Sequence, residues 1–379
     1  MKVYFDNAAT TPLDPEVFEA MKPYMLELYG NPSSIHSHGR EVRAAIERSR
    51  KTVAELLNTS PSEIFFTSGG TEADNTSIVS GIESHGIKHA ISSRIEHHAV
   101  LHTLETLEKN GKIKLSYVNL DEQGYIDLNH LEALLAKHDK SFVSLMHANN
   151  EIGNLNNIEK IGELCIAHGA IFHSDTVQSV GHYKHDLQKL KIHCMVGSAH
   201  KFHGPKGIGF LYINGDYKIA PFIYGGAQER NMRGGTENVC GIIGLAKALE
   251  IAYEHMEEHQ QYIQGLKDRM IHQLREQIPD VGFNGDSANP DSLYTVLNVC
   301  LPESEDNDML LFNLDINQIS ASGGSACSSG SNVGSHVLTA LKTDPKRGAI
   351  RFSFSKYNTP EEVDYVAEKL AQLYKVEAQ

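Results

Sequence analysis

Residues 63–75 read EIFFTSGGTEADN, and this stretch decides the fold class. The apolar run over 63–68 predicts a buried strand, and a helix is predicted to begin near Thr71. Gly69 and Gly70 lie between them and allow a tight bend. Free backbone N–H groups at such a helix start attract a phosphate, and the Thr71 hydroxyl adds a donor. Because glycine-rich turns of this kind are common, the turn alone also fits a purely structural role.

Short apolar runs alternate with amphipathic stretches from residue 60 to residue 215. Strands that alternate with helices favour a mostly parallel sheet covered on both faces, which is an α/β fold. The further predicted strands span 89–92, 112–118, 142–147, 170–173, 194–197 and 207–213, and the predicted helices span 99–109, 128–137 and 158–168.

The second part of the chain has a different pattern. A long helical stretch over 236–277 precedes a mixture of strands and helices, which suggests a smaller α+β unit. We therefore expect a large domain over 14–255 and a small domain made of 1–13 and 256–379. The predicted strands here span 293–300, 316–320 and 349–355, and the predicted helices span 306–314 and 359–375, the last with a good start at Thr359-Pro360-Glu361-Glu362.

Composition excludes several classes of protein. The 379 residues carry a formal net charge of −14, which disfavours binding to the phosphate backbone of nucleic acids. The N-terminus does not have the pattern of a secretory signal, and no apolar run approaches the roughly 20 residues that span a membrane. We therefore expect a cytoplasmic protein without nucleic-acid or membrane partners. His200 and His203 lie three residues apart without an evident third ligand, so we expect no metal site.

The five cysteines are scattered, without the close pairs typical of zinc sites or disulfide frameworks. Cys165, Cys194 and Cys300 lie in apolar segments and are expected in the core. Cys327 instead lies in the Ser/Gly-rich stretch ISASGGSACSSGSNVG over 319–334. We interpret it as a nucleophilic thiolate on a mobile loop that moves between a site and a partner. A flexible linker that happens to contain a cysteine is the alternative.

Two charged side chains follow consecutive predicted strands. Asp175, in FHSDTVQ (172–178), can pair with the ring nitrogen of a pyridine cofactor, although an aspartate that caps a helix is an equally simple interpretation. Lys201, in SAHKFHGPKG (198–207), can form a Schiff base, although most lysines are exposed loop residues. Together with the phosphate turn, these residues converge on one sheet edge and supply the parts of a pyridoxal-phosphate (PLP) site.

Three further motifs are ambiguous by themselves. A histidine in SRIEHHAV (93–100) can stack on a flat ring, or it can be one of many histidines without a function. Arg351 has the planar fork that suits the carboxylate of an amino acid, and a surface salt bridge is the alternative. Arg233 precedes Gly235 and Thr236, which can cap an anion.

Taken in order, these stretches resemble group I cysteine desulfurases, which are PLP enzymes of the class V aminotransferase type. Any one motif is moderate evidence, and the ordered set over almost the whole chain is highly specific. The matching stretches are YFDNAATTP (4–12), GNPSSIHSHGR (30–40), FTSGGTEADN (66–75), EHHAV (96–100), MHANNEIG (146–153), HSDTVQSVG (173–181), SAHKFHGPKGIG (198–209), GGAQERNMRGGTENV (225–239), SGGSACSSGS (322–331) and IRFSFS (350–355).

The resemblance implies a homodimer of fold type I, with a mostly parallel sheet of the seven-stranded type in its large domain. It also implies a role for each matching residue. Lys201 would hold PLP as a Schiff base, and Cys327 would form the persulfide. His97 would stack on the ring, Asp175 would pair with its nitrogen, and Gln178 and Asn150 would hydrogen-bond near the ring hydroxyl. The phosphate would contact Gly70, Thr71, Ser198 and His200, together with Thr236 from the other subunit, and the substrate carboxylate would bind Arg351 and Asn150.

The activity implied is removal of sulfur from L-cysteine. Lys201 would remove the Cα proton, Cys327 would attack the substrate sulfur, and alanine would leave. Acceptors of the sulfur in the family include iron–sulfur scaffold proteins and thiol carriers. The chain departs from the family at Gly323-Gly324 and at SNVGSHV (331–337), and it ends soon after its last predicted helix. A class V aminotransferase, a selenocysteine lyase and a non-catalytic partner protein with the same fold are the alternatives.

Overall fold

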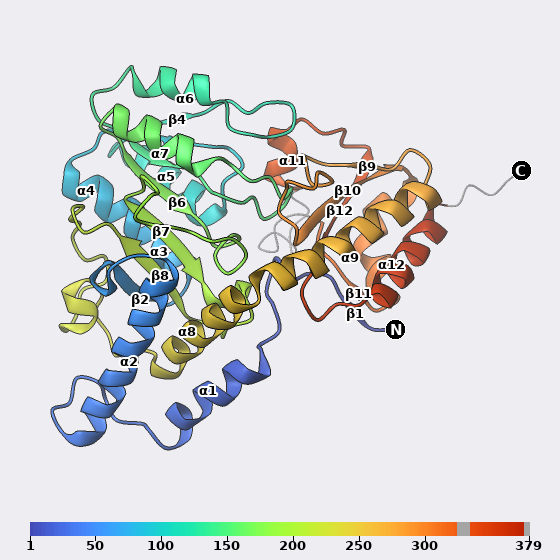
Figure 1. The fold of residues 1–379 in the computed structure, drawn as a ribbon. Coiled ribbons are helices and arrows are strands. Elements are labelled where there is room, and N and C mark those ends of the chain that lie inside the picture. The colour runs from blue at the N-terminus through green and yellow to red at the C-terminus, as the bar shows by residue number, and fades with distance from the viewer. Residues whose placement is uncertain (324–333, 375–379) are drawn as a thin grey trace, which may run out of the picture.

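The computed structural model describes residues 1–323 and 334–374. A seven-stranded sheet forms the centre of the larger part (Figure 1). Neighbouring strands from β7 through to β4 pair in parallel, whereas β8 pairs antiparallel with both of its neighbours. In spatial order the strands are β2 (Ile64–Thr67), β8 (Gly209–Ile213), β7 (Cys194–Ser198), β6 (Ile171–Asp175), β5 (Phe142–Ser144), β3 (His89–Ser92) and β4 (Lys114–Tyr117).

Helices cover both faces of this sheet, so most of its strands are buried and apolar. One face packs against α1 (Pro15–Leu26), α2 (Ser37–Leu56), α6 (Leu128–Leu135), α7 (Ile158–Ala167) and α8 (Val239–Glu254). The other face packs against a continuous helical run, α3 (Gly70–Asn75), η2 (Thr76–Ser80) and α4 (Gly81–His85), and against α5 (His98–Lys109).

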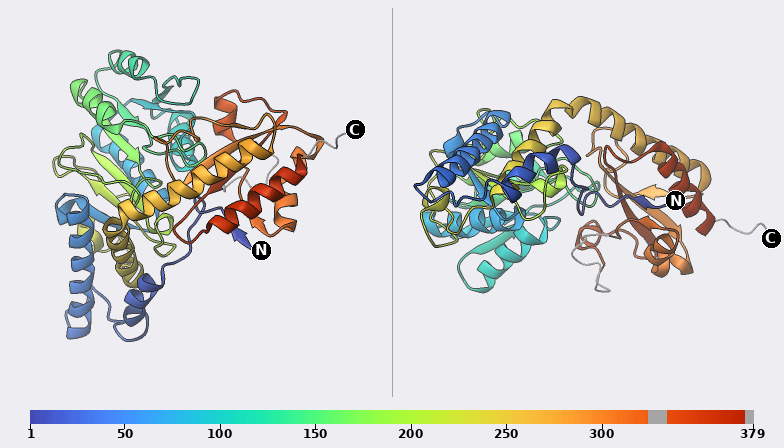
Figure 2. Two further views of the ribbon diagram at one scale, coloured as in Figure 1. Left: turned by 45° about the vertical axis from the view of Figure 1, so that its right-hand side comes forward. Right: turned by 90° about the horizontal axis from the view of Figure 1, so that it is seen from below.

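A smaller α+β unit lies beside the larger part (Figure 2). Its buried side chains form an apolar core of their own. Its antiparallel sheet has the order β12–β10–β9, and the N-terminal β1 pairs in parallel with β11. The chain passes from α8 into α9 at His255, where we propose the domain boundary. The elements are β1 (Val3–Tyr4), α9 (Met256–Gln277), β9 (Gly282–Phe283), β10 (Val296–Glu303), α10 (Leu310–Ile316), β11 (Ile319–Ser320), α11 (His336–Ala340), β12 (Arg347–Ser353) and α12 (Pro360–Leu373).

The structure confirms the predicted strands of the large sheet and the α/β class, with three differences. The stretch 236–277 is two helices with a break at His255. The predicted strand over 142–147 ends at Ser144. Beyond it the backbone N–H of Met146 bonds to the Glu96 carboxyl group instead of to a neighbouring strand, although Leu145 and His147 still donate to β6. Helices α1, α2 and α11 and the short strands β1 and β9 were not predicted. Among the described residues, no helix combines the length and the apolar character that a membrane span requires.

Candidate active site

A cavity of about 220 Å³ opens where β2, β6 and β7 end, at the carboxyl edge of the large sheet. Open α/β sheets bind their ligands at this edge. The cavity brings together ten residues that the sequence singled out, from segments far apart in the chain. They are Gly70, Thr71, His97, Asn150, Asp175, Gln178, Ser198, His200, Lys201 and Arg351.

Lys201 ends a short turn of helix that follows β7, which projects its side chain into the cavity. Its Nζ donates hydrogen bonds to the carbonyl oxygens of Ala8 (2.6 Å) and Ala9 (2.9 Å), which belong to the N-terminal segment. The Ala8 carbonyl also accepts a hydrogen bond from Nε2 of Gln178 at 3.0 Å. The N-terminal segment therefore forms one wall of the cavity and holds the amine in it.

Asp175 is the last residue of β6 and is almost completely buried. One carboxylate oxygen accepts a hydrogen bond from the backbone N–H of Val177 at 2.9 Å. Burial raises the pKa of Asp175, whereas His97, that N–H group and Lys201 act in the opposite direction. A protonated pyridine nitrogen beside this carboxylate would supply a positive charge that balances its buried negative charge. Asp175 therefore fits the predicted cofactor.

The predicted phosphate turn forms another part of the wall. No side chain caps the start of α3 at Gly69, so its first backbone N–H groups remain available to an anion. Gly70 is required here, since a Cβ atom on it would lie 2.8 Å from Cγ2 of Val177. Burial, with Lys201 and Lys206 adding to it, lowers the pKa of His200 to about 4, so its ring is neutral near pH 7. These residues fit a phosphate group.

His97 precedes α5, and its Nδ1 accepts a hydrogen bond from the backbone N–H of Ala99 at 3.1 Å. The ring orientation is therefore fixed by the start of the helix. Burial lowers the pKa of His97, Asp175 raises it, and Lys201 lowers it further. A neutral ring held in this way is suited to stacking on a flat cofactor.

Arg351 lies on β12 of the smaller unit and is 1% exposed. Its Nη2 donates to Oδ1 of Asp6 at 2.8 Å, and its Nη1 donates to the carbonyl oxygen of Asn150 at 2.9 Å. Nε is buried without a hydrogen-bond partner among the described residues. The interpretation as a surface salt bridge is therefore wrong for this residue, because its ion pair is inside the molecule and at the cavity.

Two predicted site residues are not in this cavity. Thr236 is exposed and lines a separate cavity of about 140 Å³, with Arg233 and Gly235. Arg233 forms a bidentate ion pair with Glu72 at 2.9 and 3.0 Å, so it does not have the free guanidinium of an anion site. Cys327 lies outside the described residues.

Of the other cysteines, Cys165 and Cys194 are buried as predicted, whereas Cys300 is only partly buried. Its sulfur accepts a hydrogen bond from Nε of Arg347 at 3.1 Å, so the prediction of a core position was wrong for Cys300. Within the described part of the chain, no group of three or more His, Cys, Asp or Glu side chains has the arrangement of a metal site.

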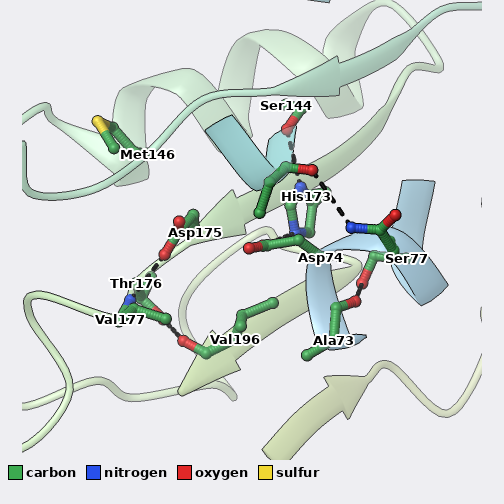
Figure 3. A network of polar contacts seen from close by, with 12 residues as sticks. Ala73, Asp74, Ser77, Ser144, Met146, His173, Asp175, Thr176, Val177 and Val196 are labelled. Atoms are coloured by element: carbon green, nitrogen blue, oxygen red, sulfur yellow. Dashed lines mark hydrogen bonds and ion pairs between the residues drawn. The ribbon is translucent and has the colours of Figure 1, made fainter. Parts of the chain in front are cut away.

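The structure adds residues that the sequence did not indicate. Ala8, Ala9, Met146, Ala148 and Val177 line the cavity as backbone or apolar wall. Asp74 also lines it and is buried beside His173 (Figure 3). One signal for Asp74 was present in the sequence, because it follows Gly70 by one helical turn and so lies on the same face of the helix.

Comparison with known proteins gives a consistent result. The family model described as aminotransferase class-V matches residues 3–366. The chain is 43% identical over 376 residues to the cysteine desulfurase IscS of Dictyoglomus turgidum, which covers 98% of this chain and 94% of that protein. It is 44% identical over 388 residues to the cysteine desulfurase IscS of Methanosarcina thermophila, with 98% and 91% covered. A solved structure of a NifS-like protein superposes with a TM-score of 0.90 at 38% identity, covering 98% of this chain and 99% of that one.

Proposed function

The chain belongs to the aminotransferase class-V family, and from this premise we propose that it is a cysteine desulfurase. The reaction is removal of sulfur from L-cysteine, which gives L-alanine and a persulfide on Cys327. One observation carries this proposal. Lys201, Asp175 and Arg351, which come from three separate segments, line a single cavity of a size suited to a small cofactor and substrate.

The residues of the cavity fit pyridoxal phosphate as the cofactor. Asp175 suits the ring nitrogen, His97 a ring face, and Gly70 and Thr71 the phosphate. When bound, PLP supplies a carbonyl carbon for attachment to an amine and a ring that accepts electrons from the substrate. We propose that Asn150 and Gln178 contact the polar edge of the ring, and that Ser198 and His200 complete the phosphate contacts.

The chain supplies the groups that move protons and orient the substrate. Arg351 binds the substrate carboxylate, with Asn150 beside it, because its fork is already held in place by Asp6. Lys201 removes the proton from Cα of the substrate, since its Nζ projects into the cavity. Asp175 keeps a negative charge beside the ring nitrogen throughout.

Cys327 then carries out the sulfur transfer. Its thiolate attacks the sulfur of the substrate, so an S–S bond forms as the bond between that sulfur and Cβ breaks. The electron pair of the broken bond remains on Cβ, which takes up a proton. Cα regains the proton that Lys201 removed, and alanine leaves. Atoms balance, because cysteine and a thiol give alanine and a persulfide.

The length of the chain supports this role for Cys327. Ser322 is bridged to the backbone of Arg351, at 3.2 and 2.6 Å. Cys327 follows Ser322 by five residues, and a five-residue stretch spans up to about 17 Å when extended. The sequence therefore allows the thiolate to reach a substrate that is bound at Arg351.

We propose a cytoplasmic homodimer that passes sulfur to an iron–sulfur scaffold or a thiol carrier. Several large apolar side chains are exposed to solvent. Examples are Leu26 at the end of α1 (68% exposed), Tyr29 just after that helix (76%) and Tyr224 in the segment that precedes Thr236 (81%). These exposed apolar side chains support a contact surface for a second copy, provided that they form one patch in the assembly. Thr236 is also exposed and is turned to a different cavity from Lys201, which supports a contact to the phosphate of a second copy.

The test is mass spectrometry of the purified protein after brief incubation with L-cysteine, with peptide mapping and an assay for alanine. We expect one added sulfur on the peptide that contains Cys327, and formation of alanine. Bound PLP without persulfide or alanine would favour an aminotransferase instead, and absence of PLP would favour a non-catalytic protein.

A further inference from the structure

Asp74 lines the cavity, and His173 lies beside it in the interior of the protein (Figure 3). Oδ1 of Asp74 lies 3.2 Å from Nε2 of His173, and these side chains are 1% and 0% exposed. Neither atom has another hydrogen-bond partner among the described residues. A buried acceptor and a buried ring nitrogen at this distance are satisfied only when a proton lies between them.

The other ring nitrogen of His173 is occupied. Its Nδ1 lies 2.9 Å from Oγ of Ser144 on the neighbouring strand β5. His173 and Asp175 are two residues apart on β6 and therefore project from the same face of the sheet. The ring of His173 thus holds the end of β6, from which Asp175 projects, against β5. The contact with Asp74 in turn holds the orientation of this ring.

The charges around Asp74 decide where the proton resides. Burial, then Asp175, then Glu96 raise the pKa of Asp74 well above its usual range. Burial lowers the pKa of His173 to about 3, so its ring is neutral. Glu96 is also completely buried, and burial raises its pKa too. Burial and two carboxyl groups thus act on Asp74, whereas His97 and Lys201 act to lower the pKa of Asp175.

We propose that Asp74 is a positioning residue that acts as a neutral hydrogen-bond donor to Nε2 of His173, so that Asp175 alone carries the negative charge beside the ring nitrogen of the cofactor. Two neighbouring buried carboxyl groups cannot both ionise opposite a single cation without a large energetic cost. If Asp74 keeps its proton, the negative charge resides on Asp175. The part of this inference that concerns the cofactor rests on the proposed function, whereas the protonation of Asp74 does not.

The first experiment uses the protein without added cofactor. Infrared difference spectra between the wild type and Asp74→Asn, both labelled with 13C-aspartate, are recorded at neutral pH. We expect the variant to lose the C=O stretch of a protonated carboxyl group. Loss of a carboxylate stretch instead would overturn the proposal. Asp14→Asn is the matched control, since hydrogen bonds from Lys356 and Tyr357 outweigh burial and lower the pKa of Asp14 to about 2, so this variant must lose a carboxylate stretch.

A second measurement needs no variant at Asp74. In 15N spectra of the wild-type histidine rings, with His173→Gln used for assignment, Nε2 of His173 is expected to be without a proton. A protonated Nε2 would contradict the donor role of Asp74.

The third experiment measures PLP dissociation constants of folded holoprotein. Asp74→Asn retains a donor and should bind PLP within about twofold of the wild type, whereas Asp74→Leu loses it and should bind roughly tenfold more weakly. Equal weakening in both variants would overturn the role as a neutral donor. If the wild type bound no PLP, the proposed function would fail while the infrared and 15N results would still stand.

Discussion

Ser335 donates a hydrogen bond from Oγ to Oε2 of Glu151 over 2.5 Å, in a buried contact. Glu151 directly follows Asn150 in the cavity wall, and Ser335 follows Cys327 by eight residues. His336 strengthens the attachment, with Nε2 2.9 Å from the carbonyl oxygen of Glu96. Both described ends of the chain that flank Cys327 are therefore held close to cavity residues.

Ser335→Ala should slow persulfide formation on Cys327 about tenfold and leave PLP absorbance unchanged. The substitution removes a buried hydrogen bond to the Glu151 carboxyl group and the cap of α11, which together contribute roughly 2–4 kcal/mol. Stopped reactions analysed by peptide mass spectrometry measure this rate. Thr359→Ala is the matched control, because it removes a comparable cap from α12 and should not change the rate. An equal rate in Ser335→Ala and the wild type would contradict the prediction.

Cys327→Ala should retain the colour of the bound cofactor and lose sulfide release in the presence of a reductant. In the proposed reaction, cofactor attachment requires the amine of Lys201, and only the later sulfur transfer requires a thiolate. Cys240→Ala serves as the control, since Cys240, like Cys300, is only partly buried and we propose no role for it. Normal sulfide output from Cys327→Ala would refute the persulfide role.

Arg351→Lys should raise the KM for L-cysteine by roughly tenfold or more, because a lysine cannot reproduce the two-pronged contact with a carboxylate. The loss of the contacts to Asp6 and Asn150 adds to the effect. Steady-state alanine formation measures it. Arg347→Lys, on the same strand and paired with Asp280 at the surface, should leave KM unchanged. A similar rise in both variants would point to a general effect on β12.

The burial of Lys267 predicts that the stability of the folded protein depends on pH. Lys267 is fully buried and donates to Oγ of Ser292 and the carbonyl oxygen of Leu293, and burial lowers its pKa to about 7. Between pH 7 and its ordinary value of 10.5 the unfolded chain binds more protons, so stability rises with pH in this window. Below pH 7 both states are protonated, so stability no longer changes with pH and the full cost of burying the charged amine remains.

The measurement compares urea unfolding of the wild type and Lys267→Met at pH 7.5 and pH 9. The difference between their free energies of unfolding should shift by about 2 kcal/mol in favour of the wild type at the higher pH. A difference independent of pH would mean that Lys267 is charged in the folded state.

The sequence predicted much of the fold and many of the side chains in the cavity. Strands built mainly from apolar residues, such as 142–144 and 209–213, are buried on both faces, and that pattern is local. Lys201 and Asp175 were found because each follows such a strand, and the carboxyl ends of parallel strands share one edge. The start of α12 at Thr359 was predicted from its capping residues for the same local reason.

The sequence by itself therefore determined the α/β class and which motifs lie at the sheet edge, since periodicity and turn chemistry operate over a few residues. Only the tertiary structure decided the pairing of Arg351 with Asp6, the reversed direction of β8, and the contact of Asp74 with His173. These relationships join residues that are far apart in the chain. Their energies depend on burial and on the distance between charges, and neither quantity exists until the chain has folded.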